Sequence, residues 1–86
     1  MSFFVYFVEC SDKTIYCGFT NNLQTRISDH NNSNKGAKYT RTRRPVVLVY
    51  FEEFESKNDA LKREHFLKSL TRREKIKLIE SKDNFL

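Results

Sequence analysis

Glycine, proline and cysteine are scarce in this chain of 86 residues, which holds two glycines, one proline and two cysteines. So few glycines and prolines argue against a disordered chain and against a glycine-rich loop that cradles phosphates. Two cysteines do not make the disulfide framework of a small secreted protein. The first residues also lack the basic segment that begins a secretory signal peptide. We therefore expect a cytoplasmic protein.

Tryptophan is absent, and no apolar run approaches the ~20 residues of a membrane-spanning helix, so no membrane association is expected. Eight phenylalanines and four tyrosines nevertheless supply an apolar core. At this length we expect one domain spanning residues 1–86, with a limited core. The formal net charge of +5 favours nucleic acid or another polyanion as a partner, although an ordinary basic surface carries the same charge.

Two segments near the start of the chain predict a β-hairpin. Residues 3–10 and 14–19 are rich in aromatic and β-branched side chains, which is typical of strands. The three polar residues between them fit a common hairpin loop.

The register of this hairpin follows if the residues at the two ends of the loop face each other. Tyr6 then faces Gly18, which leaves open space beside the tyrosine ring. Tyr6 and Tyr16 become diagonal neighbours on one face of the sheet, roughly 7–8 Å apart. Cys10 and Cys17 fall on opposite faces, so we expect them not to bond to each other.

The rest of the chain predicts one more strand and three helices. A helix over 23–30 follows two candidate N-cap asparagines, and 31–45 is a long irregular stretch. The strand over 46–54 is so continuously apolar that we expect it to be central. Capping sequences predict helices over 56–70 and 72–82. The order β-β-α-β-α-α indicates an α+β fold, with a small three-stranded antiparallel sheet flanked by helices.

Glu64 occupies an unusual place in the first of these last two helices. At about 100° per residue it falls within the apolar stripe, between Ala60 and Leu67. An acid on an inward face is costly unless a metal, a cation or a hydrogen-bond donor meets it. The ordinary alternative is a half-exposed carboxylate that pairs with Arg26 or with Lys68.

Arg26 and His30 lie one helical turn apart and therefore share a helix face. Each has an ordinary alternative, since Arg26 can pair with Asp29 and His30 is favoured at a helix C-terminus by the helix dipole. Taken together with the two tyrosines and the acid, they form a set that we interpret as one site. The set is Tyr6, Tyr16, Arg26, His30 and Glu64.

The irregular stretch 31–45 holds five cations, one aromatic residue and no acid. Interleaved cations and aromatics suit phosphate contacts and base stacking, and they position nucleic acid without reading its sequence. The alternative is a mobile solubilising loop. The residues that we predict to contact nucleic acid are Lys35, Lys38, Tyr39, Arg41, Arg43 and Arg44.

The order of these elements and residues resembles the GIY-YIG nuclease family over nearly the whole chain. The tripeptide Phe-Val-Tyr that ends at Tyr6 stands where the family has Gly-Ile-Tyr, and residues 16–18 read Tyr-Cys-Gly in place of Tyr-Ile-Gly. Arg26, His30 and Glu64 follow in family order. The basic stretch also resembles small stand-alone bacterial members of the family, and structure-specific nucleases of the superfamily share a similar loop.

The resemblance implies a role for each residue of the set. Glu64 would hold one divalent ion, Mg²⁺ or Mn²⁺. Tyr6 would orient or deprotonate the attacking water, and His30 would take the proton in turn. Arg26 would contact phosphate oxygens, and Tyr16 would position a phosphate oxygen or the water.

These roles describe a magnesium-dependent endonuclease acting on DNA, with branched or damaged DNA as the expected substrate and repair or recombination as the expected setting. One alternative is a nucleic-acid-binding protein that keeps the fold with weak or no catalysis. Another is an interaction module targeted by a partner protein. A homodimer is also compatible with cutting two strands.

Overall fold

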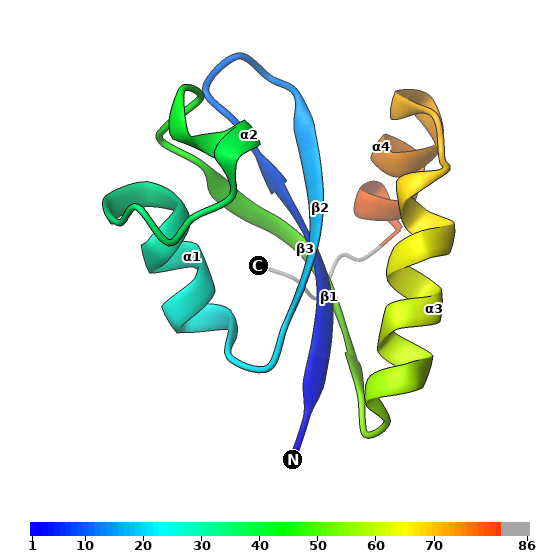
Figure 1. The fold of residues 1–86 in the computed structure, drawn as a ribbon. Helices are drawn as coiled ribbons and strands as arrows, with labels where there is room; N and C mark the ends of the chain where they lie inside the picture. The colour runs from blue at the N-terminus through cyan, green and yellow to red at the C-terminus, as the bar shows by residue number, and fades with distance from the viewer. Residues whose placement is uncertain (82–86) are drawn as a thin grey trace.

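The computed structural model describes residues 1–81, and Figure 1 shows its arrangement. The order of elements agrees with the sequence prediction, except that a four-residue helix forms within the stretch expected to be irregular. The elements are β1 (Phe3–Glu9), β2 (Ile15–Thr20), α1 (Leu23–Asn32), α2 (Lys38–Arg41), β3 (Val47–Phe54), α3 (Lys57–Lys68) and α4 (Arg72–Glu80).

The three strands form one antiparallel sheet in the order β2-β1-β3. The prediction that the third strand is central was therefore wrong, because β1 occupies the centre. Four consecutive β1 residues, 5–8, are fully buried, whereas Val47 and Phe51 of β3 remain 59% and 36% exposed. An apolar run marks a strand, but it does not distinguish a central strand from an edge strand.

The predicted hairpin register is confirmed, with Tyr6 opposite Gly18. The loop closes through hydrogen bonds from the Cys10 amide to the Thr14 carbonyl at 2.8 Å and from the Lys13 amide back to Cys10 at 2.9 Å. Lys13 adopts a left-handed conformation with φ of 71°, as expected of a hairpin in which a type I turn is followed by a left-handed residue.

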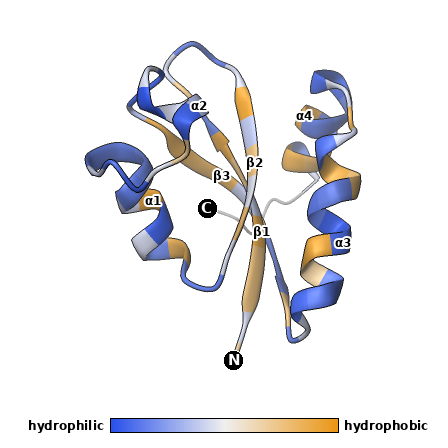
Figure 2. Ribbon diagram, viewed as in Figure 1, coloured by the Kyte–Doolittle hydropathy of each residue, from blue (hydrophilic) through white to orange (hydrophobic). Residues whose placement is uncertain are grey.

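Helices cover both faces of the sheet: α1 and α2 lie on one face, and α3 and α4 lie on the other (Figure 1). Apolar residues follow the strands, while the chain around α2 is hydrophilic (Figure 2). Alternation along β1 divides the buried residues between two clusters, with Val5 and Phe7 facing α3 and Tyr6 and Val8 facing α1. Both cysteines are free, and they lie in different clusters.

Side-chain caps define where the helices begin, as the sequence indicates. Asn22 caps α1, Ser56 caps α3, and Thr71 and Glu74 form a capping box at α4. The last helix ends at Glu80, and residue 82 of its expected range lies outside the described residues. Within residues 1–81 the longest helix spans 12 residues, and none is both long and apolar enough to cross a membrane.

Candidate active site

Tyr6 lies at the centre of the sheet, fully buried on the side that α1 covers. Its ring fills the space above Gly18 on the neighbouring strand. A Cβ atom at position 18 would lie 2.5 Å from Tyr6 Cζ and closer still to the hydroxyl oxygen. Residue 18 must therefore be glycine for the Tyr6 ring to keep this position.

A chain of buried hydrogen bonds begins at the Tyr6 hydroxyl. Tyr6 Oη lies 2.7 Å from Nε2 of His30, the last inward residue of α1. Nδ1 of His30 lies 2.8 Å from Thr40 Oγ1, and this hydroxyl donates to the Ala37 carbonyl at 2.9 Å. The chain therefore connects the central strand, through α1, to α2.

Burial holds the proton on the tyrosine and off the histidine. Desolvation, reinforced by the charges of Arg26 and Arg44, lowers the pKa of His30 to about 4. Desolvation raises the pKa of Tyr6 to about 12, although hydrogen bonding and charge from Arg26 act in the opposite direction. At neutral pH the pair consists of a neutral imidazole and a neutral phenol.

The low pKa of His30 predicts that the free energy of unfolding depends on pH. Unfolding restores an ordinary pKa of 6.5, so the unfolded chain takes up this proton first as the pH falls. The His30 contribution is complete above pH 6.5, and about 3 kcal/mol of it is lost as the pH falls towards 4. We expect urea unfolding to show this loss in the wild type and not in His30→Gln. The matched control is His65→Gln, at the exposed residue on α3, which should retain the wild-type pH dependence.

Tyr16 stands beside the pair and links it to α2. Its ring meets His30 edge-on, with centroids 5.5 Å apart, and stacks on Tyr39 at 5.8 Å. The Arg43 guanidinium lies 3.9 Å from the Tyr39 ring centroid. Tyr39, which the sequence suggested for base stacking, thus contacts two other side chains of the protein.

Arg26 is half-buried one turn before His30. Its hydrogen bonding and its positive charge act to lower the pKa of the Tyr6 hydroxyl. Its guanidinium also donates to the Lys35 carbonyl at 2.8 Å. Arg26 therefore holds the start of the basic stretch close to the Tyr6–His30 pair.

The basic stretch divides into structural and exposed cations. Arg44 donates to three carbonyls at the end of α1, those of His30 at 2.5 Å, Ser33 at 2.5 Å and Asp29 at 3.3 Å. Arg43 pairs with Asp12 of the hairpin loop at 3.0 Å. These two arginines make contacts within the protein, and their contact with nucleic acid stays a prediction.

The remaining cations of the stretch face solvent. Arg41 donates to the Asn34 carbonyl at 3.0 Å but is otherwise exposed. Lys35 and Lys38 are exposed, and neither forms an ion pair with any residue between 1 and 81. Within the stretch 31–45, these three are the cations most available to an outside partner.

Glu64 lies on α3, which packs on the opposite face of the sheet from α1. Its carboxylate pairs with Lys68 at 3.2 Å, and the Glu64 side chain as a whole is 18% exposed. The pKa of the Cys17 thiol is raised to about 12. Burial is the largest cause, and the negative charge of Glu64 is the next. Cys17 stands between Tyr16 and Gly18 on the edge strand β2. Glu64 therefore approaches this edge from one face, while the other four residues of the predicted set gather on the other.

The donor chemistry at Glu64 fits a hard divalent ion that a substrate helps to bind. The part of the chain that the structure describes contains no group of three or more histidine, cysteine, aspartate or glutamate residues able to hold a metal. Mg²⁺ does not need such a group, since it is usually bound by one or two carboxylates together with waters and substrate phosphates. Glu64 is the residue that would hold it.

The chain matches the model of the GIY-YIG catalytic domain over residues 2–77. The chain belongs to the GIY-YIG family. It is 52% identical to a UPF0213 protein of Staphylococcus haemolyticus, over 92% of this chain and 95% of that protein. It is 56% identical to a UPF0213 protein of Clostridium perfringens, over 92% and 84% of the two chains.

Two solved structures are similar to this GIY-YIG protein. The solution structure of a UPF0213 protein from Bacillus halodurans is 44% identical, with a TM-score of 0.62 over 95% of this chain and 86% of that one. A protein from E. faecalis is 38% identical, with a TM-score of 0.65 over 94% and 85%. GIY-YIG domains form a nuclease family whose members generally depend on a divalent metal and act on DNA.

Three residues that position the site carried no sequence signal of that role. A Cβ atom at Gly36 would lie 2.6 Å from the Asp29 carbonyl oxygen, so this glycine lets the chain pass close to the end of α1. Asn31 pairs through its side-chain amide with both backbone groups of Val46, at 2.7 and 3.0 Å. Thr40 is the fully buried partner of His30. Each of these contacts joins residues that are distant in the sequence, so the sequence alone does not reveal it.

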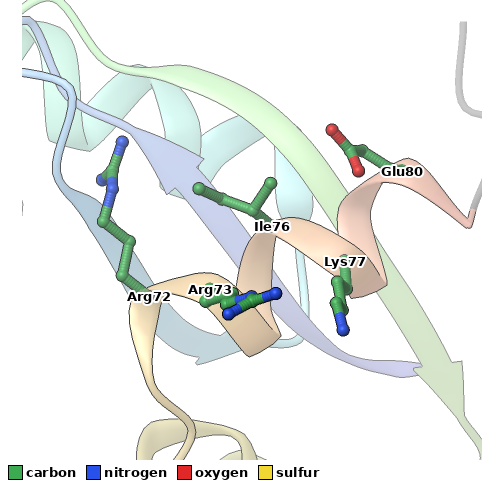
Figure 3. A pocket seen from close by; sticks show the side chains of 5 residues that line it. All are labelled: Arg72, Arg73, Ile76, Lys77 and Glu80. Atoms are coloured by element: carbon green, nitrogen blue, oxygen red, sulfur yellow. The ribbon is translucent and has the colours of Figure 1, made fainter.

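A surface pocket of about 500 Å³ lies apart from these residues, on α4 (Figure 3). None of the site residues described above lines this pocket. It is lined by Arg72, Arg73, Ile76, Lys77 and Glu80.

Proposed function

We propose that this protein is a magnesium-dependent endonuclease that hydrolyses DNA phosphodiester bonds in the cytoplasm, as a single catalytic domain. The observation that carries the proposal is the buried pair of Tyr6 Oη and His30 Nε2, 2.7 Å apart beside Arg26. A phenol with a neutral imidazole behind it and a cation beside it is suited to handling the proton of an attacking water.

Tyr6 is fully buried in this structure, so the proposed reaction requires a water to reach its hydroxyl oxygen. Tyr6 would orient that water, and His30 would provide the route for the proton. As the water gives its proton to Tyr6 Oη, the tyrosine gives its own proton to His30 Nε2, so free tyrosinate does not accumulate. The resting pKa of His30 opposes this transfer, because burial and two arginines disfavour the imidazolium. A bound phosphate near Arg26 offsets that positive charge and favours protonation of His30.

Three further residues would act on the phosphate. The planar fork of Arg26 is suited to phosphate oxygens, and the Tyr16 hydroxyl would position a phosphate oxygen or the water. Glu64 would hold Mg²⁺ at the edge of β2, where a bound divalent ion neutralises developing charge and stabilises the leaving oxygen.

The DNA backbone would cross the outer edge of β2. Among residues 1–81 this strand pairs only with β1, and the two helical layers lie on either side of the sheet (Figure 1). A phosphate bound at this edge would lie between the face of the sheet that carries Tyr6 and the face that carries Glu64. Lys35, Lys38 and Arg41 would contact neighbouring phosphates.

Contacts of this kind read backbone geometry and carry no base sequence. We therefore propose branched or damaged DNA as the substrate, in repair or recombination. Cutting both strands would take a second copy or a partner protein.

The test is cleavage of labelled single-stranded, duplex, flap and four-way-junction DNA with Mg²⁺, with Mn²⁺ and with EDTA. We expect a divalent ion to support cutting, EDTA to abolish it, and flap or junction DNA to be cut faster than plain duplex. Salt-dependent binding without cutting of any substrate would replace the nuclease with a nucleic-acid-binding protein. The absence of both activities would leave an interaction module.

The division of the basic stretch predicts two different phenotypes. Lys35→Met with Lys38→Met should reduce the slope of log affinity against log salt concentration by about 2, with an unchanged free energy of unfolding. Arg44→Met should instead lower the free energy of unfolding by about 2 kcal/mol, because it removes charged hydrogen bonds to helix carbonyls. Fluorescence anisotropy and urea titration measure the two quantities. A stable Arg44→Met that binds DNA weakly would contradict the structural role.

A further inference from the structure

The hydroxyl of Thr40 is fully buried and lies directly behind the proposed proton acceptor. It is 2.8 Å from His30 Nδ1 and 2.9 Å from the Ala37 carbonyl oxygen. A carbonyl oxygen only accepts hydrogen bonds, so the single hydroxyl proton of Thr40 is donated to Ala37. The Thr40 oxygen then faces His30 as an acceptor.

This arrangement determines the tautomer of His30. A neutral imidazole carries one N–H, and the acceptor at Thr40 places it on Nδ1. Nε2 is left with its lone pair pointing at Tyr6, and the Tyr6 hydroxyl donates to it. All the bonds in the chain from Tyr6 to Ala37 therefore run in one direction.

We propose that Thr40 is a positioning residue for the reaction, which keeps His30 in the Nδ1–H tautomer so that Nε2 can receive the Tyr6 proton. Its catalytic consequence rests on the proposed function, whereas the tautomer itself does not. When Nε2 gains the proton, Thr40 continues to accept from Nδ1–H, so no group behind the histidine has to reorient.

Removing the Thr40 hydroxyl should reverse the direction of the hydrogen bond between Tyr6 and His30. In Thr40→Val the Nδ1–H has no partner in a buried place, which costs free energy. The Nε2–H tautomer becomes favoured because it can donate to Tyr6 Oη. Tyr6 must then turn its own proton away from His30, towards the position of the attacking water, and its inward route for a proton is lost.

Two local features keep Thr40 in place. The close approach of Gly36 to the backbone of Asp29 and His30 holds the chain before α2 against α1. The Tyr16–Tyr39 stack then holds α2 itself against β2. The acceptor for His30 is therefore supplied by the same segment that carries the exposed cations.

The first arm of the experiment measures the tautomer by long-range ¹H–¹⁵N correlation of the histidine side chains at pH 7, without DNA. The chain contains two histidines, and the exposed His65 serves as the internal reference for an averaged tautomer. We expect His30 to be Nδ1–H in the wild type and in Thr40→Ser, and to shift towards Nε2–H in Thr40→Val. An Nε2–H tautomer in the wild type would overturn the proposal, even if Thr40→Val failed to fold.

The second arm measures single-turnover cleavage at saturating protein. Thr40→Val should be slower by about 10–100-fold, by analogy with the loss on removing the hydrogen-bond partner behind a metal-ligating histidine, and Thr40→Ser should restore the rate. A folded Thr40→Val with altered tautomer and wild-type rate would remove Thr40 from the reaction. If the wild type cut no DNA, the nuclease proposal would fail, and the spectra would still decide the tautomer.

Discussion

Tyr6→Phe is expected to cut DNA at least about 100-fold more slowly than the wild type, the lower end of the contribution of a positioned acid–base group. The substitution keeps the ring that packs above Gly18 and removes only the oxygen that would orient the water and pass its proton to His30. Substrate binding through the exposed lysines should be unchanged. The loss should therefore appear in the single-turnover rate at saturating protein, with an unchanged affinity.

Tyr50→Phe is the matched control, because it also removes a hydroxyl from a buried tyrosine of the same sheet. Tyr50 lies in the cluster that faces α3, and its hydroxyl donates to Glu52. Each variant should lose about 1–2 kcal/mol of stability through a broken buried hydrogen bond. Only Tyr6→Phe should lose activity. Equal rates for the two variants would assign the Tyr6 hydroxyl a purely structural role.

Gly18→Ala is expected to lower the free energy of unfolding by about 3 kcal/mol, the upper end for forcing an atom into a packed core. The new Cβ would lie 2.5 Å from Tyr6 Cζ, so the ring or the strand has to move. Because the same movement separates Tyr6 from His30, the cleavage rate should fall as well. Urea unfolding gives the first quantity, and Ser28→Ala on the exposed side of α1 should change it by less than about 0.5 kcal/mol.

A double-mutant cycle identifies the cause of that loss. If the added methyl group collides with the Tyr6 ring, Gly18→Ala should cost about 2 kcal/mol less in a Tyr6→Ala background, where the ring is absent. Additive losses would mean that the glycine is needed for strand conformation and not for the close approach to Tyr6.

The hairpin could be predicted because its determinants are local. Loop length and alternation set the register that brings Tyr6 opposite Gly18 and divides the cysteines between the two faces. The position of β3 could not be predicted in this way, because both β1 and β3 are apolar and strand order depends on contacts distant in sequence. Exposure of Val47 became evident only from the assembled sheet.

Sequence periodicity brought four residues of the candidate set to one place, and it did not indicate that Glu64 lies on the other face of the sheet. Helical periodicity placed Arg26 beside His30, and it placed Glu64 on the stripe of its own helix. Periodicity within one helix does not say which face of the sheet that helix covers. The structure places Glu64 with Lys68, on the opposite side of β2 from Tyr6.

Charge composition predicted the basic stretch but not the use of each cation. Arg44 and Lys38 are equivalent in composition, yet Arg44 satisfies carbonyls at the end of α1 and Lys38 faces solvent. The same limit applies to Thr40, whose hydroxyl reaches a histidine ten residues earlier only because α2 folds back onto α1.

We propose that Glu64 acts with the Tyr6–His30 pair across the edge of β2. The most direct test is the Mg²⁺-dependent, single-turnover cleavage rate of Glu64→Gln beside Glu55→Gln, a charge-matched change at an exposed residue. We predict a loss of about 1000-fold for Glu64→Gln, because several kcal/mol of charge stabilisation disappear with the metal site. Glu55→Gln should match the wild type. A Glu64→Gln protein that cuts DNA at the wild-type rate would remove Glu64 from the reaction.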